Sequence, residues 1–413
     1  MSSTSVVSSP KRDARSLHGW LLTSTCWLGS TGAVLIAPVL PFMQRDFSSV
    51  KYVELLTLVI LVVPGLMIAL FSPLVGTLVD RFGKKRFYLL AILLYAAFGI
   101  LPFWLTNLYA ILASRVVIGL AEAAIATIAT ALVANYFNGV ERQKWLTMQQ
   151  ASASVVAVVM FSLGGVLGGL PAGWRTPFLV YGFAIVFLPL IAVFIWEPEG
   201  DDRALTARAP KLPFPWRLIG HICVTIIFAS IMFFVVPVQI SFLLAARGVS
   251  TPALIGAGSA IANAGIPIGG FLFHRFSKWS INRLLTLSFC LFTVGFCVIA
   301  SLPEANAAVV GAFIAGVGGG MALPLLGTWL VARLPFEQSG RGTGGYVGAF
   351  FLGNFLSPFV VAAIGHVSGG LFSAIGWLAV LCGVATAVTL ALTLSRRGPT
   401  ESVRSVEVRA IGH

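Results

Sequence analysis

Long apolar runs separated by short polar or charged breaks make up almost the whole chain. Each run has about 20 residues or more, enough for a helix to cross the hydrocarbon core of a membrane. The pattern predicts twelve transmembrane helices, over residues 20–43, 53–79, 87–106, 108–136, 145–169, 175–196, 217–244, 251–274, 283–302, 306–333, 342–364 and 370–394. The sequence therefore predicts an all-α integral membrane protein.

A short charged segment, Gly76 to Arg86, separates the second and third runs, and a weaker copy lies at 270–278. Aligning Pro73–Lys84 with Pro267–Lys278 gives identities at Pro, Gly, Leu, Arg, Phe and Lys, six of the twelve aligned positions. The duplication predicts two pseudo-symmetric six-helix bundles. Transporters built from such repeats bind substrate near the midplane, between the two halves.

This division predicts five segments along the chain. They are a cytoplasmic N-terminal tail at 1–19, an N-terminal six-helix bundle at 20–196, a cytoplasmic linker at 197–216, a C-terminal six-helix bundle at 217–394 and a cytoplasmic C-terminal tail at 395–413. The linker is polar and rich in proline, as expected of a solvated connection rather than a catalytic loop.

The charge of the chain is unusual in amount and in placement. The chain is 58% hydrophobic and 10% charged, with a net charge of +13, whereas an ordinary soluble domain is about 25% charged. With the N-terminus inside, all 27 Lys and Arg fall on cytoplasmic segments except Arg45, Lys51, Arg175, Arg247 and the intramembrane Arg115. The positive-inside rule then predicts two cytoplasmic termini, most simply in a bacterial inner membrane.

The same residues disfavour several other classes of protein. No basic cluster lies on a folded polar face, so a nucleic-acid partner is not expected. No GxxxxGK[S/T] or HExxH motif occurs, so neither direct ATP drive nor a metal-dependent enzyme is expected. We expect no cofactor and no metal site, and we do not expect an enzyme.

Arg115 and Glu122 are the ionisable residues of the predicted helix 108–136. They are seven residues apart, which places them on one helix face, and Glu122 lies near the helix centre. An ionisable group at that depth is a functional hypothesis by default. Glu122 is either a proton-carrying carboxylate or a structural partner of Arg115.

The charged segment resembles the helix 2–3 signature of the major facilitator superfamily, through Gly76-x-Leu78-x-Asp80-Arg81-x-Gly83-Lys84. Asp80 lies at a helix C-terminus, where the helix dipole disfavours an anion. Its compensating contacts could form in one global state and break in another. The resemblance implies a conformational latch formed by Gly76, Asp80, Arg81, Gly83 and Lys84. The second copy has His274 in place of Asp80, so the latch is assigned to the first half.

Two further segments are similar to signatures of this family. Arg115 followed by Gly119 is similar to the helix 4 pattern, which in proton-driven members is linked to coupling, and this implies that Arg115 and Glu122 couple protons. The helix 5 antiporter signature is matched in part by Gly164, Gly168 and Gly169, with Gly165 where proline is expected. However, Gly119-Leu-Ala-Glu-Ala is also similar to helix 4 of organic-anion importers.

Few polar residues are available to line a central cavity. The candidates are Thr31, Gln239, Asn263, Tyr346 and Asn354. An apolar cavity with one carboxylate suits hydrophobic or amphipathic cargo better than a sugar.

The favoured hypothesis is a proton-coupled exporter of small, drug-like or amphipathic organic compounds that works by alternating access. The alternative is a proton-coupled importer of a small organic anion, with Arg115 on the substrate carboxylate. A channel or a non-transporting sensor is disfavoured, because no repeated polar rings and no signalling domain are evident. The expected partners are a small-molecule substrate, protons and the lipid bilayer, and the expected functional unit is a monomer.

Overall fold

The computed structural model describes residues 14–197, 216–331, 333–334 and 339–395. Most of the predicted tails at 1–19 and 395–413, and of the linker at 197–216, lies outside these ranges. The first half consists of α1 (Ser16–Val34), η1 (Ala37–Val39), α2 (Leu40–Asp46), α3 (Val53–Phe82), α4 (Lys84–Ile100), η2 (Leu101–Phe103), α5 (Leu108–Tyr136), α6 (Gly139–Gly168), η3 (Gly173–Val186) and α7 (Phe187–Phe194).

The second half consists of α9 (Trp216–Ala246), α10 (Pro252–Asn263), α11 (Gly265–Arg275), α12 (Ile281–Ser301), α13 (Ala305–Val331), α14 (Ser339–Ser368) and α15 (Leu371–Leu394). Within the described residues these elements supply 12 segments long and apolar enough to cross a membrane. The predicted all-α membrane architecture is therefore confirmed.

Prolines break two of the spans that the apolar pattern predicts as single helices. A proline lacks an N–H and its ring clashes with the carbonyl of the residue four positions earlier. Pro38 lies four residues after Val34, where α1 ends, and Pro267 lies four residues after Asn263, where α10 ends. The continuous helices expected over 20–43 and 251–274 are corrected accordingly.

The sixth span also departs from the prediction of one α-helix over 175–196. Its first part, η3, is a 3₁₀-helix of 14 residues that contains Pro177, and only α7 is α-helical. Runs of 3₁₀-helix longer than three or four residues are uncommon and often mark a strained or functional segment.

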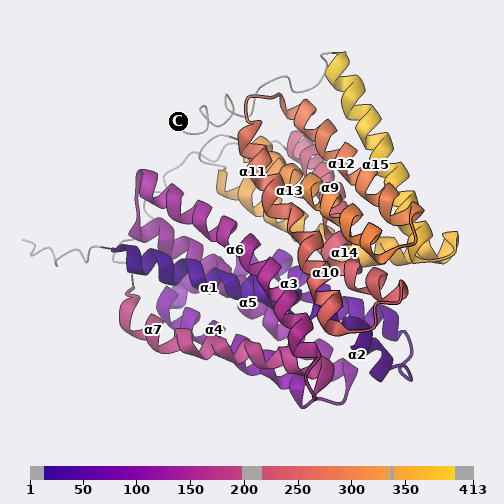
Figure 1. The fold of residues 1–413 in the computed structure, drawn as a ribbon. Coiled ribbons are helices and arrows are strands. Elements are labelled where there is room, and N and C mark those ends of the chain that lie inside the picture. Colours follow the sequence, from indigo (N-terminus) through magenta and orange to yellow (C-terminus); the bar gives the residue numbers. More distant parts are fainter. Residues whose placement is uncertain (1–13, 198–215, 332, 335–338, 396–413) are drawn as a thin grey trace, which may run out of the picture.

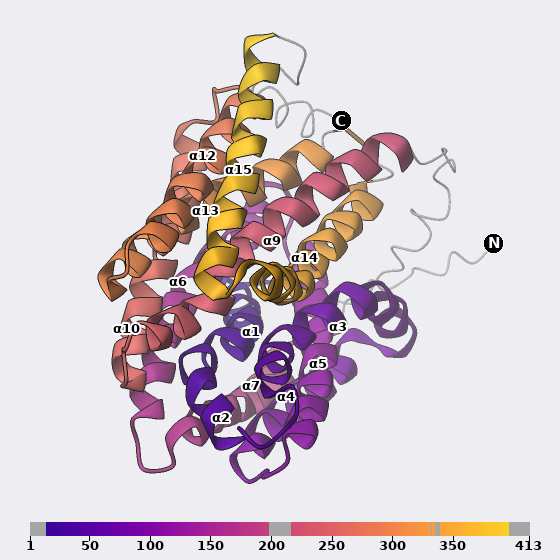
Figure 2. The same cartoon turned by 90° about the vertical axis from the view of Figure 1, so that its right-hand side faces the viewer.

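Two hydrophobic cores organise the structure. One is built almost entirely from residues of α1 to α7 and the other from residues of α9 to α15. Figure 1 and Figure 2 show the two halves as separate stacks of helices, the first indigo to magenta and the second magenta to yellow. Val238 and Ala260 of the second half are buried in the first core, so the halves are joined by side-chain packing.

The described residues form twelve spans, an even number, so the start of α1 and the end of α15 lie on one face. We call the face where α1 begins and α15 ends the terminal face, and the face where α2 ends and α10 begins the opposite face. In Figure 1 the ribbons of the two stacks diverge toward the side where α1 begins and converge toward α2 and α10. The halves meet mainly where α6 packs on α10 and α3 packs on α14.

Candidate functional site

Arg115 of α5 is completely buried, with 0% exposure, inside the first half. Its guanidinium carbon lies 4.7 Å from the ring centre of Tyr181 and 5.6 Å from that of Phe178, both from η3. Its Nη1 donates a 3.0 Å hydrogen bond to the Tyr181 hydroxyl. Among the described residues, Nε and Nη2 have no hydrogen-bond partner.

The Tyr181 hydroxyl connects Arg115 to helix α1, because it donates in turn to the carbonyl of Gly32. A second tyrosine, Tyr95 of α4, donates a 2.7 Å hydrogen bond to the carbonyl of Leu28, one turn earlier in α1. The rings of Tyr95 and Tyr181 lie 5.3 Å apart. Tyr181 thus links α1 to Arg115 of α5, and Tyr95 links α1 to α4.

Glu122 is 4% exposed and lies on the same α5 face as Arg115. Its carboxylate contacts the Cα of Gly32, where a Cβ would overlap Oε1. No described residue offers a hydrogen-bond donor to Oε1, and no ion pair joins Arg115 to Glu122 in this part of the chain. An unpartnered charged oxygen is costly to bury, so this atom is available for a proton or a cationic ligand.

The charged loop between α3 and α4 is anchored inside the first half. Gly83 has φ +96°, a conformation that favours glycine, and it allows the sharp turn. The Glu197 carboxylate accepts hydrogen bonds from the backbone N–H groups of Lys84 (2.7 Å) and Lys85 (2.9 Å). It therefore caps the N-terminus of α4, where a negative charge is favourable.

The lysine side chains of this loop reach neighbouring helix ends. Lys84 Nζ donates to Asn135 Oδ1 at 2.9 Å, and Lys85 Nζ donates to the Ala192 carbonyl at 2.7 Å. Of the predicted latch residues, Gly83 and Lys84 thus make their contacts with other residues of the first half. Gly76 has open space around it, because a Cβ there would meet no atom within 4 Å. The side chains of Asp80 and Arg81 lie outside the described part of the structure.

The predicted helix 5 glycines lie where α6 meets two other segments near the opposite face. A Cβ at Gly164 would overlap the carbonyl of Leu35, and one at Gly168 would overlap Val39. Gly169 contacts only its own turn. Gly165, which the prediction left out, packs against Gly256 of α10, with a Cβ 2.7 Å from the Gly256 Cα. Small residues permit this close approach of helix backbones.

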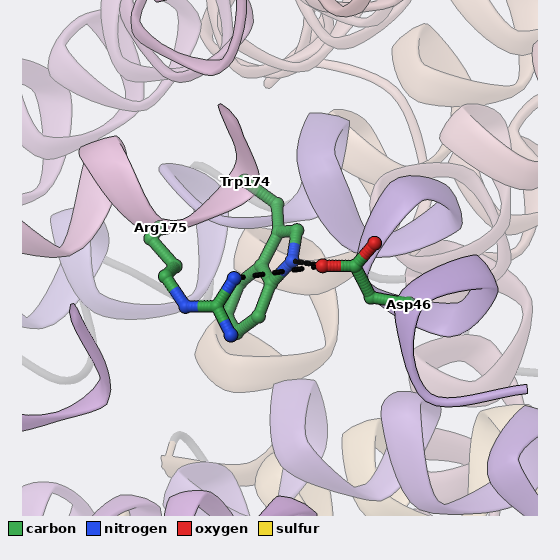
Figure 3. Close-up of polar contacts among 3 residues, drawn as sticks. All are labelled: Asp46, Trp174 and Arg175. Carbon is green, nitrogen blue, oxygen red and sulfur yellow. Dashed lines mark hydrogen bonds and ion pairs between the residues drawn. The ribbon is translucent and has the colours of Figure 1, made fainter. Parts of the chain in front are cut away.

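The first half is also tied together at the opposite face. Figure 3 shows Asp46, at the end of α2, beside Trp174 and Arg175 at the start of η3. Trp174 Nε1 donates a 2.6 Å hydrogen bond to Asp46 Oδ2, and Arg175 Nη1 lies 3.5 Å from the same oxygen. The Arg175 guanidinium stacks over the Trp174 ring at 4.2 Å. These contacts fix the end of the first span to the start of the sixth.

The predicted cavity residues are placed on four helices of both halves. Thr31 donates to the Trp27 carbonyl at 2.8 Å, Asn263 Nδ2 to the Ser259 carbonyl at 2.8 Å, and Tyr346 to the Leu323 carbonyl at 3.2 Å. Gln239 is buried in α9. Asn354 lies over Gly65 of α3, at the contact between the halves.

Toward the terminal face, three glycines of α3 and α14 make no contact through an added Cβ. A Cβ at Gly344 or Gly348 of α14 would meet no atom within 4 Å, as at Gly76 of α3. Asn354 and Gly65 touch near the middle of these helices, and Gly165 and Gly256 touch near the opposite face. Among the described glycines, those that contact the other half lie in the middle and toward the opposite face, and none of them lies at the terminal face.

The Major Facilitator Superfamily model matches residues 22–358. The chain belongs to this family. Its members are membrane transporters, so the protein is an integral membrane transporter and not an enzyme. The twelve-helix fold that the sequence resemblance implied is confirmed.

Curated relatives include antibiotic resistance proteins. The chain is 25% identical over 376 residues to the tetracycline resistance protein, class C, of Escherichia coli, covering 87% of this chain and 92% of that protein. It is 27% identical over 368 residues to the chloramphenicol resistance protein of Streptomyces lividans, covering 85% and 90%. A solved bacterial homolog of the human lysosomal transporter Spinster, in an inward-facing and occupied conformation, superposes with a TM-score of 0.72 at 15% identity, covering 93% and 98%. At that identity the structural likeness shows the fold alone.

Proposed function

We propose that this transporter is a proton-coupled exporter of small amphipathic organic compounds. The observation that carries the proposal is the buried, unpartnered carboxylate oxygen of Glu122 in the middle of a transmembrane helix. An intramembrane carboxylate of this kind is typical of proton relays. The similarity to tetracycline and chloramphenicol resistance proteins supports the direction and the class of cargo.

In this proposal Glu122 takes up a proton from outside and releases it inside. Arg115 sets the electrostatic environment of Glu122. The Tyr181 hydroxyl is bound to Arg115 and to the carbonyl of Gly32, the residue whose Cα the Glu122 carboxylate contacts. A change in the packing of α1 against α5 would therefore reach the carboxylate directly. In this proposal, proton transfer is coupled to transport because the protonation of Glu122 changes the position of α1.

Alternating access requires a second state in which the terminal face closes. With both termini in the cytoplasm, the present arrangement is the inward-open state. In the outward-open state, we expect Asp80 and Arg81 to form the latch, with Gly76 giving α3 a small surface for close packing. Gly165 and Gly168, which contact α10 at Pro252 and Gly256, would then release α10.

The cargo would bind between the halves, near the middle of the membrane. Thr31, Gln239, Asn263, Tyr346 and Asn354 are the polar residues proposed to line this site. We further propose a bacterial inner membrane as the location and a monomer as the functional unit.

The experiment is a flux assay in oriented proteoliposomes, with tetracycline and chloramphenicol as first probes and a panel of small carboxylates beside them. We expect an imposed pH gradient to drive drug-like compounds out of the compartment that contacts the terminal face, with a matching proton flux in the other direction. Proton-coupled uptake of a carboxylate, with no movement of the drug-like compounds, would instead support an organic-anion importer and overturn the proposal.

A further inference from the structure

A groove of about 320 Å³ lies on the second half, away from the contact between the halves. Ala300 at the end of α12 lines it together with residues at the start of α15, namely Phe372, Ser373, Gly376, Trp377 and Val380. Helices α12 and α15 pack side by side at the edge of the molecule in Figure 1 and Figure 2. Trp377 and Val380 are 55% and 54% exposed. The groove therefore faces the surrounding lipid.

The depth of the groove matches one leaflet. Ala300 and Phe372 lie at the ends of the spans Ile281–Ser301 and Leu371–Leu394, which places them at the membrane interface on the opposite face. Val380 lies eight residues further along α15, about 12 Å at a rise of 1.5 Å per residue. Half of the hydrocarbon core is about 15 Å thick, so the groove spans most of the depth of a single leaflet.

A positive charge lies at the shallow end of the groove. The Arg247 guanidinium stacks over the ring of Phe372 at 4.9 Å. Its Nη1 donates a 2.7 Å hydrogen bond to the Glu304 carbonyl, and its Nη2 donates to the Ile299 carbonyl. These partners are neutral carbonyls, which do not neutralise the guanidinium charge. The arginine is thus held in place, and its charge remains available to an anionic group.

A negative charge accompanies it. Burial lowers the pKa of Arg247 while the nearby Glu304 carboxylate raises it, and an arginine stays charged at neutral pH in either case. The Glu304 residue is exposed. Beside the groove residue Phe372, therefore, Arg247 supplies a cation, and Glu304, whose backbone it binds, supplies an anion nearby.

We propose that this groove is a binding site for a zwitterionic phospholipid of the leaflet on the opposite face. One acyl chain lies in the groove along α15, the phosphate contacts Arg247, and the headgroup ammonium contacts Glu304. An anionic phospholipid offers the phosphate but no ammonium, which leaves Glu304 facing a negative headgroup. The charge pair thus selects the zwitterionic class.

The test is native mass spectrometry of the purified full-length protein with added phosphatidylethanolamine, phosphatidylcholine and phosphatidylglycerol of one acyl composition. We expect both zwitterionic lipids to be retained in preference to phosphatidylglycerol. Glu304→Gln removes this preference, and Arg247→Gln weakens retention of all three lipids about tenfold, as expected for the loss of a charged hydrogen bond.

A matched pair of glycine substitutions tests the groove without touching the charges. Gly376→Leu fills the groove, and Gly383→Leu is the control, two turns further along α15. A Cβ at Gly376 would lie 3.6 Å from Ala300 of α12, and one at Gly383 would lie 3.7 Å from Thr293 of α12, so both make an ordinary contact. We expect only Gly376→Leu to lose the bound lipid. Equal retention in both variants, equal binding of all three lipids to the wild type, or a dimer that Gly376→Leu abolishes would overturn the proposal.

Discussion

The carboxylate of Glu122 lies directly against the Cα of Gly32, so that a Cβ at Gly32 would overlap Oε1. This contact joins α5 to α1 at the residue whose carbonyl accepts the Tyr181 hydrogen bond. A movement of α1 would therefore change the surroundings of the Glu122 carboxylate.

Gly32→Ala is expected to displace the Glu122 carboxylate. The carboxylate is the end of a flexible side chain, so it moves rather than the helices, and we expect unfolding stability to change by less than about 1 kcal/mol. The pH profile of transport should shift. Gly29→Ala is the control on the same helix, because its Cβ would meet nothing within 4 Å. Identical pH profiles for the two variants would contradict the importance of this contact.

Tyr181→Phe is expected to uncouple Arg115 from α1. The ring and its stacking with Arg115 remain, but Arg115 Nη1 and the Gly32 carbonyl each lose a buried partner, which costs about 1–3 kcal/mol. Tyr95→Phe removes a comparable bond, to the Leu28 carbonyl, without removing one from Arg115. Thermal unfolding should show a loss for both, larger for Tyr181→Phe because two buried groups lose a partner instead of one, and only Tyr181→Phe should alter the pH profile. A shift of the same size in Tyr95→Phe would reduce Tyr181 to a packing role.

Gly165→Ala is expected to separate the two halves at the opposite face. The added Cβ would lie 2.5 Å from the Pro252 carbonyl oxygen and 2.7 Å from the Gly256 Cα, and backbone atoms of packed helices cannot move aside separately. Spin labels on cysteines replacing the exposed Ser48 and Ser250 should report a longer distance by double electron–electron resonance.

Gly169→Ala is the control for this experiment, because the nearest atom to its Cβ belongs to its own turn, Val166 O at 3.3 Å. An unchanged distance distribution in Gly165→Ala would show that this contact does not hold the opposite face closed.

Glu197→Ala is expected to loosen the charged loop, because the N-terminus of α4 loses its cap. Backbone amides around Lys84 and Lys85 should exchange with deuterium faster, as measured by mass spectrometry. Glu141→Ala is the comparison. Glu141 lies in the first turn of α6, where its negative charge interacts favourably with the dipole of that helix and not with α4. Equal protection of residues 84–88 in both variants would argue against the cap.

The sequence predicted the twelve spans because the membrane requires long apolar helices, a constraint that acts on each segment separately. The helix break before Pro267 follows from the clash of the proline ring with the carbonyl four residues earlier. Whether such a clash ends a helix or only bends it depends on the packing around it, which the sequence does not give. The 3₁₀ geometry of Gly173–Val186 has no clear signal in residue type. Local pattern thus predicts the elements and not their irregularities.

The sequence indicated only those residues of the candidate site that lie on a single helix. Arg115 and Glu122 were found because their seven-residue spacing is visible in the sequence. Tyr181 and Gly32 were not, because their contact joins residues 149 positions apart, and a buried tyrosine is usually a packing residue. Glu197 was missed for the same reason, since its partners at Lys84 and Lys85 are 113 and 112 positions away.

The most direct test of the central claim is proton flux through Glu122→Gln in oriented proteoliposomes, with tetracycline and chloramphenicol as probes. Glutamine keeps the shape of the side chain but cannot carry the proton. We predict that the variant still moves these compounds down their own gradients, while a pH gradient no longer drives their transport and no proton flux accompanies it. Glu54→Gln, in the first turn of α3, should behave as the wild type. Retained pH-driven transport in Glu122→Gln would contradict the account.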